Sequence, residues 1–270
     1  MRLQGEVALV TGAGSGIGRA IALRFAIEGA DVVVIGRSHE SIEWTSQEVR
    51  KLGRHVLTIK ADISHRREVD QMVNKAVQTF GKIDILVNNA GVQGPIGPVV
   101  ENDIDQWIKT VNVNLIGTFL CTRAVLPAMI RQNKGKIINL SGGGATSPRP
   151  RFSAYAASKA AVVRLTETIA EEVKDYNIQV NAIAPGAVNT RMQEEVLASG
   201  DVVAMQEARR ILTTVGIPPE KAAELAVFLA SDASNGLTGR LISAAWDDWK
   251  MMDIKKVMSS DLYTLRRKVT

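Results

Sequence analysis

Hydrophobic positions along the chain alternate between two patterns. Seven short runs are mainly apolar, without a regular alternation of polar residues, and mostly rich in β-branched residues; they span residues 7–10, 32–35, 56–59, 83–87, 136–140, 178–183 and 241–243. Such continuous runs indicate strands of a parallel sheet covered on both faces. Longer stretches with helical spacing lie between them, at residues 17–27, 41–52, 66–80, 104–131, 153–173 and 219–229. This alternation predicts right-handed crossovers and a doubly wound α/β sheet of about seven strands.

Length and composition indicate one globular domain. The chain has 270 residues, with no internal repeat and no linker-like change of composition. We therefore expect a single domain over residues 1–245, with residues 246–270 as a C-terminal extension of the same domain. The extension contains Trp246 and Trp249, which could wall a pocket, pack on a neighbouring subunit or pack on their own domain.

The composition also bears on compartment and metal binding. Hydrophobic residues make up 46% and charged residues 23%, the balance of an ordinary soluble protein. The apolar runs fall far short of the roughly 20 residues of a spanning helix, and the N-terminus shows no export signal. Cys121 is the only cysteine, in an apolar run that favours a buried, inert thiol. With only His39, His55 and His65 besides, we expect no metal site, no membrane insertion and a cytoplasmic location.

The net charge of +5 permits an acidic ligand or a nucleic acid. However, the basic residues are dispersed, and no Lys/Arg run with interleaved aromatic residues is present. A solvated basic surface is the favoured interpretation, and a polyanionic cofactor would account for part of the excess. We therefore expect no nucleic-acid partner.

A glycine-rich turn follows the first predicted strand and precedes a helix. Glycines permit positive φ and let a phosphate approach the backbone, while the helix N-terminus supplies free N–H groups and partial positive charge. A glycine-rich turn alone is weak evidence, but the flanking strand and helix strengthen it. The turn predicts a phosphate site at residues Thr11, Gly12, Ser15, Gly16, Ile17 and Gly18.

The end of the second predicted strand bears on the choice of dinucleotide. An acidic residue there would accept hydrogen bonds from the ribose 2′-hydroxyl and favour NAD. The chain instead has Gly36, Arg37 and Ser38. A guanidinium can bind a 2′-phosphate through two charge-assisted hydrogen bonds. Arg37 therefore predicts NADP(H), with NAD still possible, unless its side chain simply points into water.

Several motifs match one known family in order along most of the chain. The turn has the spacing Thr-Gly-x-x-x-Gly-x-Gly, which resembles the nucleotide loop of the short-chain dehydrogenase/reductase family. Further matches are Asp62 with Ile63, the run Asn89-Ala90-Gly91, Asn114, Tyr155 with Lys159 in Tyr-x-x-x-Lys, and Pro185-Gly186 followed by Val188 and Thr190.

The resemblance implies a Rossmann-like fold and hydride transfer between a nicotinamide and an alcohol/ketone substrate. It implies that Asp62 contacts the adenine and that residues 185–190 hold the nicotinamide. Tyr155 would be the general acid/base, Lys159 would grip the nicotinamide ribose, and Asn114 would hold a water that relays protons. The resemblance also implies a homotetramer or homodimer, formed by the helices that carry Asn114 and Tyr155.

The chemistry of Tyr155 and Lys159 can be argued independently. Positions i and i+4 lie on one face of a helix, about 6 Å apart along its axis. Lowering the pKa of a free phenol from about 10 to neutral pH requires roughly 4 kcal/mol. A positive charge at about 5 Å, in an effective dielectric of about 20, supplies roughly 3 kcal/mol. The ammonium would thus do most of the activation, although an isolated pair of this kind would be ordinary surface residues.

One position departs from the family. The substrate-polarising serine would lie 13 residues before Tyr155, where this chain has Gly142. A shifted loop could bring Ser141 into register, and we predict Ser141 as the fourth catalytic residue. Ser141 could equally be a strand-end hydroxyl, with Ser153 a distant substitute. Without the donor, the rate would fall by about 10²–10³.

Two functions remain in competition. The first is an NADP(H)-preferring alcohol dehydrogenase or ketone reductase, and the second is a catalytically impaired dinucleotide-binding sensor or scaffold, which Gly142 motivates. The intact Tyr155, Lys159 and Asn114 argue for the enzyme, because a pure binder does not need all three. Residues 190–212 are expected to cover the pocket. Arg149 and Arg151 could hold an acidic substrate or be solvated loop charges.

Overall fold

The seven predicted strands form one parallel sheet in the order β3-β2-β1-β4-β5-β6-β7. The computed structural model describes residues 1–213 and 216–267. The five central strands β1, β2, β4, β5 and β6 are buried along most of their length, as the apolar runs predicted, whereas the edge strands β3 and β7 are mostly half-buried. The strands are β1 (Val7–Thr11), β2 (Asp31–Gly36), β3 (Val56–Lys60), β4 (Ile85–Asn88), β5 (Gly135–Leu140), β6 (Ile178–Ala184) and β7 (Leu241–Ser243).

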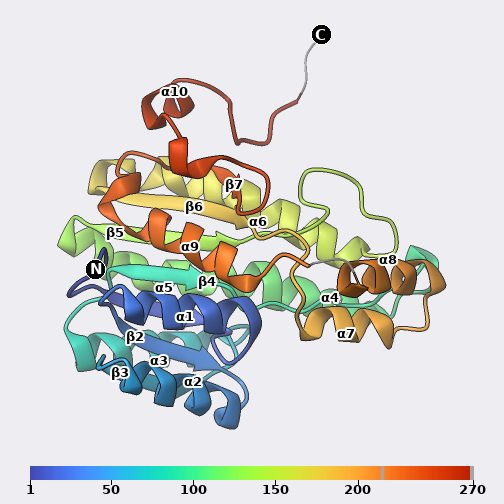
Figure 1. The fold of residues 1–270 in the computed structure, drawn as a ribbon, viewed down its shortest axis with the longest axis horizontal. Helices are drawn as coiled ribbons and strands as arrows, with labels where there is room; N and C mark the ends of the chain where they lie inside the picture. Colours follow the sequence, from blue (N-terminus) through green and yellow to red (C-terminus); the bar gives the residue numbers. More distant parts are fainter. Residues whose placement is uncertain (214–215, 268–270) are drawn as a thin grey trace.

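Helices cover both faces of the sheet, which confirms the doubly wound, Rossmann-like α/β fold (Figure 1). One core lies between the sheet and α1, α2 and α9, and a second core lies between the other face and α3, α5 and α6. The helices are α1 (Gly16–Ile27), α2 (His39–Lys51), α3 (Arg66–Phe80), α4 (Ile104–Val111), α5 (Gly117–Gln132), α6 (Ser153–Glu172), α7 (Arg191–Leu197), α8 (Val202–Thr213), α9 (Pro219–Ala230) and α10 (Ile254–Met258).

The second core contains Cys121, which is fully buried. Burial raises the pKa of its thiol to about 12, so the thiolate is not accessible at neutral pH. This confirms the expectation of a buried, inert cysteine.

The helical stretch predicted at residues 104–131 is not one regular helix. A π-helical segment, Asn112–Ile116, separates α4 from α5. Together, residues Ile104–Gln132 are long and apolar enough to cross a membrane by length and composition alone. Half of the most apolar window is buried, and α5 packs against β4, β5 and α3, as a core helix of a globular protein does.

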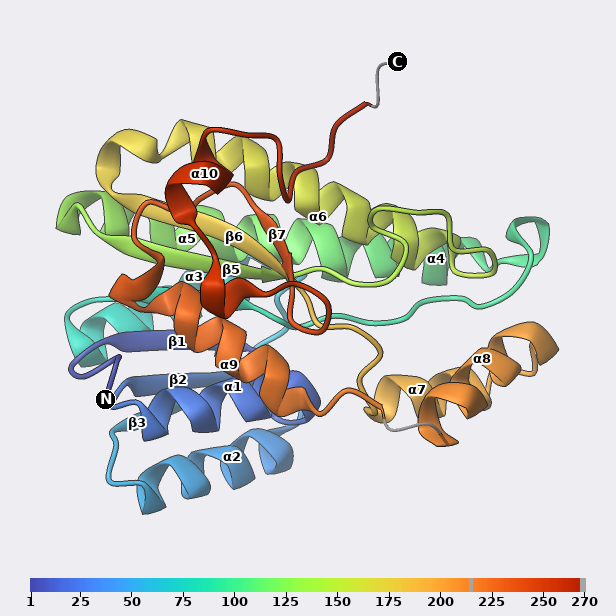
Figure 2. The ribbon, with the colours of Figure 1, turned by 45° about the horizontal axis from the view of Figure 1, so that its top comes forward.

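The order of the strands places a crevice at one edge of the sheet. β1 pairs with β2 on one side and with β4 on the other, so the direction of winding reverses between β1 and β4. Ligands of such sheets bind beyond the carboxyl ends of the strands at this point. The strand arrows lead to this edge, and α4, α7 and α8 project beyond it (Figures 1 and 2).

The C-terminal extension packs along β7 and α9. The Trp249 ring lies 5.5 Å from the Phe228 ring of α9 and is buried. The amide of Leu241 donates to the Tyr263 carbonyl at 2.8 Å. Trp249 therefore packs on the same chain, whereas Trp246 is 82% exposed and borders the cavity described next.

Candidate active site

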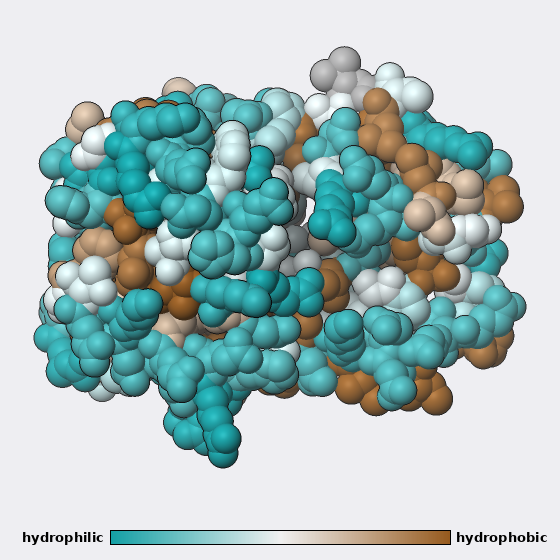
Figure 3. Space-filling view, turned by 90° about the horizontal axis from the view of Figure 1, so that it is seen from below, coloured by the Kyte–Doolittle hydropathy of each residue, from teal (hydrophilic) through white to brown (hydrophobic). Residues whose placement is uncertain are grey.

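A cavity of about 680 Å³ opens at the carboxyl ends of the strands. The glycine-rich turn and the ends of β2 to β6 line it, together with α6 and the segment that carries α7 and α8. Seen from below, the molecule is hollowed between the part that holds the sheet and the smaller part formed around α7 and α8 (Figure 3). The volume suits a cofactor and a small substrate together.

Two glycines of the turn lie where no side chain fits. Gly12 has φ +64°, and a Cβ there would lie 2.8 Å from the Ala90 Cα. A Cβ at Gly18 would overlap the Gly12 carbonyl oxygen and the Asn89 side-chain nitrogen. Because these two glycines have no side chain, the backbone of the turn can lie directly against the start of α1 and against the segment that follows β4. The turn is thereby fixed as a surface of backbone groups.

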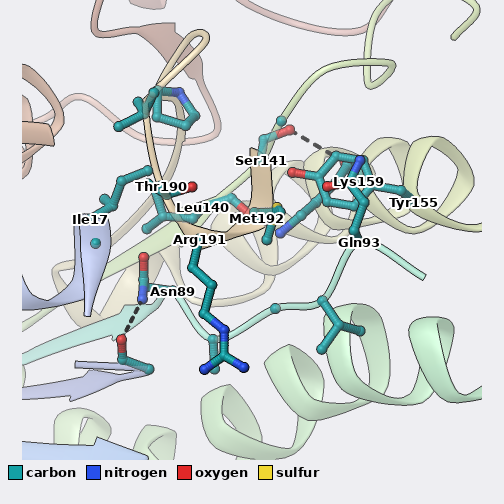
Figure 4. Close-up of a pocket in the computed structure, with 18 of the residues that line it drawn as sticks. Ile17, Asn89, Gln93, Leu140, Ser141, Tyr155, Lys159, Thr190, Arg191 and Met192 are labelled. Atoms are coloured by element: carbon teal, nitrogen blue, oxygen red, sulfur yellow. Dashed lines mark hydrogen bonds between the residues drawn. The ribbon is translucent and has the colours of Figure 1, made fainter. Parts of the chain in front are cut away.

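Hydrogen bonds tie the turn to the segment after β4. The amides of Asn89 and Ala90 donate to the Thr11 hydroxyl at 3.0 and 3.1 Å. The Asn89 side chain donates to the carbonyls of Thr11 and Gly12 at 2.9 and 3.1 Å (Figure 4). Thr11 and Gly18 do not line the cavity. Thr11 and Gly18 instead pack behind the residues that form the cavity wall. The other residues predicted for the phosphate site do line the cavity: Gly12, Ser15, Gly16 and Ile17.

The N-terminus of α1 fits a phosphate. Ser15 is its N-cap residue and makes no side-chain capping bond, and no acidic residue lies in the first turn. The first N–H groups and the positive end of the helix dipole therefore face the cavity without a competing carboxylate. A dinucleotide phosphate fits this cradle, whose close packing a Cβ at Gly12 or Gly18 would disrupt.

Arg37 and Ser38 are exposed at the rim of the cavity, and their contact with a 2′-phosphate stays a prediction. Arg37 forms no salt bridge with any residue in 1–213 or 216–267. Asp62 lies near it: burial raises the pKa of this carboxyl, but hydrogen bonds from Ser64 and the Arg37 charge lower it, and the net pKa lies below its usual value. Ile63, next in the chain, packs against Gly117 and lines the cavity.

Tyr155 and Lys159 both face the cavity from the first turns of α6 (Figure 4). The Lys159 Nζ lies 5.7 Å from the centre of the Tyr155 ring and donates to the Leu140 carbonyl at 2.8 Å. Burial lowers the pKa of Lys159 to about 8. Burial also raises the pKa of Tyr155, and only the Arg149 charge opposes it.

The predicted activation of the phenol by the ammonium is therefore not seen in the protein alone. Removal of the phenolate from water outweighs the nearby charges, so the Tyr155 pKa lies above its usual value. The ammonium of Lys159 is itself destabilised by burial. The Arg149 charge lowers the Tyr155 pKa, but burial has the larger effect.

Asn114 lies in the π-helical segment, is fully buried and does not line the cavity. Its side-chain oxygen accepts from the Val92 amide at 2.9 Å. Its side-chain nitrogen donates to the Val92 carbonyl and to the Ser158 hydroxyl, both at 3.0 Å. Asn114 thus clamps the backbone that follows Gly91. Its role with a water stays a prediction.

Gly142, and not Ser141, lies against the phenol. A Cβ at Gly142 would overlap the Tyr155 hydroxyl, so the phenol occupies the space that a side chain there would take. The Ser141 hydroxyl lines the cavity, but its hydrogen bond goes to the Lys159 carbonyl at 3.5 Å. Ser153 lies in another network, between Trp107 and Asn102. Ser141 as a substrate donor stays a prediction.

The segment after β6 closes the cavity opposite α6. Pro185, Gly186, Val188 and Thr190 all line it, as predicted. Val188 forms a bridge with Ile217, and Thr190 precedes the first residue of α7.

Several cavity residues were not predicted as site residues. Gln93 and Met192 line the cavity, and no motif pointed to them. Arg149, which the sequence suggested as a possible contact for an acidic substrate, also lines the cavity; its guanidinium lies 3.9 Å above the Phe152 ring and pairs with Glu207 of α8 at 2.9 Å. Its neighbour Arg151 pairs with Asp201, and both arginines therefore tie the 142–152 loop to the α7–α8 segment. The run of three glycines at 142–144 was the sequence signal that this loop is unusual.

Fold and cavity together define a dinucleotide-binding α/β protein, with a tyrosine and a lysine facing the binding crevice. The family model of short chain dehydrogenases matches residues 6–200. The chain belongs to this family of nicotinamide-dependent oxidoreductases.

Relatives support the assignment over nearly the whole chain. The chain is 40% identical over 242 residues to the 3-oxoacyl-[acyl-carrier-protein] reductase FabG of Thermotoga maritima, covering 90% of this chain and 97% of that protein. It is 40% identical over 239 residues to 3beta-hydroxysteroid dehydrogenase 1 of Eggerthella lenta, covering 88% and 91%. Among solved structures, levodione reductase superimposes with a TM-score of 0.84 at 32% identity, covering 90% and 96%.

Proposed function

We propose that this protein is an NADP(H)-preferring oxidoreductase that interconverts an alcohol and a ketone. The observation that carries the proposal is the placement of Tyr155 and Lys159, one helical turn apart, in the cavity that the glycine-rich turn borders. Relatives named as a 3-oxoacyl reductase and a hydroxysteroid dehydrogenase support the choice of a C=O/CH–OH substrate.

The residues in and around the cavity are proposed to have separate roles in the reaction. The bound nicotinamide would supply or accept the hydride. Tyr155 donates its proton to the substrate oxygen during reduction and takes it back during oxidation. Lys159 holds the nicotinamide ribose and lies close enough to the phenol to stabilise its anion. Asn114 keeps the segment after β4 in place and is proposed to hold a relay water, and Ser141 is proposed as a second donor to the substrate oxygen.

The remaining predicted residues would hold the dinucleotide. Arg37 and Ser38 are proposed to bind the 2′-phosphate, which motivates the preference for NADP(H) over NAD(H). Support comes from the exposed, unpaired guanidinium at the cavity rim and from the lack of a carboxylate at the end of β2. Asp62 and Ile63 would contact the adenine, and residues 185–190 the nicotinamide.

Exposed apolar side chains support a homotetramer or homodimer. Ile104 and Ile108 of α4 are 74% and 48% exposed, and Phe119 of α5 is 42% exposed. Such a row of apolar side chains is costly in water and is typical of a subunit interface.

The absorbance of the reduced nicotinamide, followed with a broad panel of ketones and alcohols, tests the enzymatic function. We expect turnover with NADPH and a loss of about 10²–10⁴ in kcat/KM in Tyr155→Phe, because the proton donor is removed. Tyr176→Phe, on the exposed side chain of Tyr176, is the matched control and should change nothing. NADPH binding without turnover across the panel would instead favour a dinucleotide sensor or scaffold, which the missing side chain at Gly142 motivates.

A further inference from the structure

The side chain of Gln93 is buried in the wall of the cavity without a complete set of partners. The residue is 4% exposed, and its Nε2 has no hydrogen-bond partner among the residues that the structure describes. It lines the same cavity as Tyr155 and Lys159, and the close-up shows all three near one another (Figure 4). A buried amide donor with no acceptor opposes folding, and a ligand oxygen placed against it removes that cost.

The backbone holds this amide in place. Asn114 bonds to both the N–H and the C=O of Val92, the residue before Gln93. On the other side, Gly94 has φ +77°, and a Cβ there would overlap the Thr110 side chain. The segment is therefore fixed at both ends, and the donor is pre-organised rather than free to find a partner elsewhere.

Gln93 borders both this cavity and the smaller neighbouring one, and the wall of the main cavity opposite Gln93 offers few free donors to a substrate. Gly142 has no side chain, and the Ser141 hydroxyl, proposed above as a donor to the reacting oxygen, also has the Lys159 carbonyl as an acceptor at 3.5 Å. Arg149 is engaged by Glu207. Gln93 lies on the segment between β4 and α4, whereas Tyr155 projects from α6. The two groups thus approach a bound substrate from different elements.

We infer that Gln93 donates a hydrogen bond from Nε2 to a second oxygen of the substrate, while Tyr155 serves the reacting oxygen. The substrate class is then a ketone or alcohol that carries an uncharged acceptor oxygen close to the reacting carbon. The inference rests on the proposed function, because it needs a substrate bound beside Tyr155. A neutral amide suits a carbonyl, ester or hydroxyl oxygen, since no charge on the protein is needed to balance it.

Matched ketones test this specificity. 2,3-Pentanedione is compared with 2-pentanone, which lacks its second carbonyl oxygen, and ethyl 3-oxobutanoate is compared with 2-heptanone, which has the same chain length but lacks the ester oxygens. kcat/KM is measured with NADPH for the wild type, Gln93→Met and Gln93→Glu. Gln106→Met is the control, because Gln106 is exposed on α4 and borders only a neighbouring cavity.

We expect Gln93→Met to lower kcat/KM for the two acceptor-bearing ketones by about 5- to 100-fold, because one hydrogen bond is lost. The values for 2-heptanone and 2-pentanone should not change, and at pH values where its carboxyl is ionised Gln93→Glu should behave like Gln93→Met, since a carboxylate cannot donate. An equal loss for both members of each pair, or no loss, overturns the inference. Weaker NADPH binding with unchanged preference also overturns it, because Gln93 would then serve the cofactor.

A binding measurement separates this inference from the proposed function. Calorimetric titration of the four ketones into the NADP⁺-loaded protein does not depend on turnover. Tighter binding of the acceptor-bearing ketones, lost in Gln93→Met, supports the role of Gln93 even if no ketone is reduced. If neither pair shows a preference in binding or in turnover, Gln93 does not recognise a second oxygen.

Discussion

The two walls of the cavity are built in different ways. On the cofactor side, the turn at Gly12–Gly18 is fixed by backbone contacts and by the bonds between Asn89 and Thr11, and a Cβ at Gly12 or Gly18 would overlap neighbouring atoms. On the substrate side, the 142–152 loop contains three glycines, and ion pairs with the α7–α8 segment hold it. The first wall is the proposed site of the dinucleotide, a ligand common to this family. The second can change with the substrate, because charges and loop residues can be exchanged without rebuilding the sheet.

The largest effect is expected on the cofactor side. Gly18→Ala places a methyl group against the Gly12 carbonyl and the Asn89 amide, so the turn must shift. A displacement of this size costs on the order of 10²-fold in NADPH affinity, and the overpacking lowers the free energy of unfolding by about 1–3 kcal/mol. Titration of NADPH and thermal unfolding measure the two effects.

Gly53→Ala is the control for Gly18→Ala. Gly53 has positive φ in an open turn with nothing near its Cβ position. The Gly53→Ala variant should therefore have a lower free energy of unfolding but an unchanged NADPH affinity. If Gly18→Ala bound NADPH as tightly as the wild type, the turn would not be the rigid wall described above.

A smaller effect is expected for the corresponding change on the substrate side. Gly142→Ala would push the Tyr155 hydroxyl out of its place, and we expect kcat to fall by up to about 10²-fold with NADPH affinity unchanged. Gly142→Ser introduces the hydroxyl typical of the family together with the same displacement, so it should recover part of the loss relative to Gly142→Ala. Steady-state kinetics of both variants measure kcat, and NADPH titration measures their cofactor affinity. Full wild-type activity of Gly142→Ala would show that the phenol has room to move.

Arg37 tests the cofactor wall without disturbing its packing. Arg37→Leu removes a charge-assisted bond to the 2′-phosphate, and because the side chain is exposed we expect a loss of roughly 10- to 30-fold in NADPH affinity. NADH affinity should not change, since NADH has no 2′-phosphate. Arg66→Gln, on an exposed side chain of α3, is the control, and binding is measured by fluorescence titration of both cofactors. An equal loss of affinity for NADPH and NADH would show that Arg37 does not contact the 2′-phosphate.

The same contrast explains what could be predicted from the sequence. All seven strands were predicted, because a parallel sheet buried on both faces leaves continuous apolar runs in the chain. The glycine-rich turn and the pair of Tyr155 and Lys159 were found because their spacing is local. Gln93 was missed, since its burial depends on the clamp by Asn114, which is 21 residues away in the chain. The π-helical segment and the helices α7 and α8 were also missed, as their apolar faces pack on parts of the chain distant in sequence.

The smallest effect is expected for Arg149, on the substrate side of the cavity, and it is measured as a change in the dependence of kcat/KM on pH. The charged groups that face the Tyr155 phenol are Lys159 from α6 and Arg149 from the loop, and Glu207 of α8 partly neutralises Arg149. Burial raises the Tyr155 pKa, and the Arg149 charge lowers it. Removing this positive charge in Arg149→Met makes the phenolate less stable, so the pKa rises further.

Oxidation of an alcohol needs the phenolate, so its rise with pH should move to higher pH in Arg149→Met. At a fixed pH below the transition, kcat/KM should fall several-fold, to about tenfold at most, because the paired and partly exposed guanidinium is screened. Arg149→Lys keeps the charge and should keep the profile, and Glu207→Gln should move it to lower pH. The profile of kcat/KM against pH is the measurement. A uniform loss of rate with an unmoved profile in Arg149→Met would mean that Arg149 only holds the loop to α8.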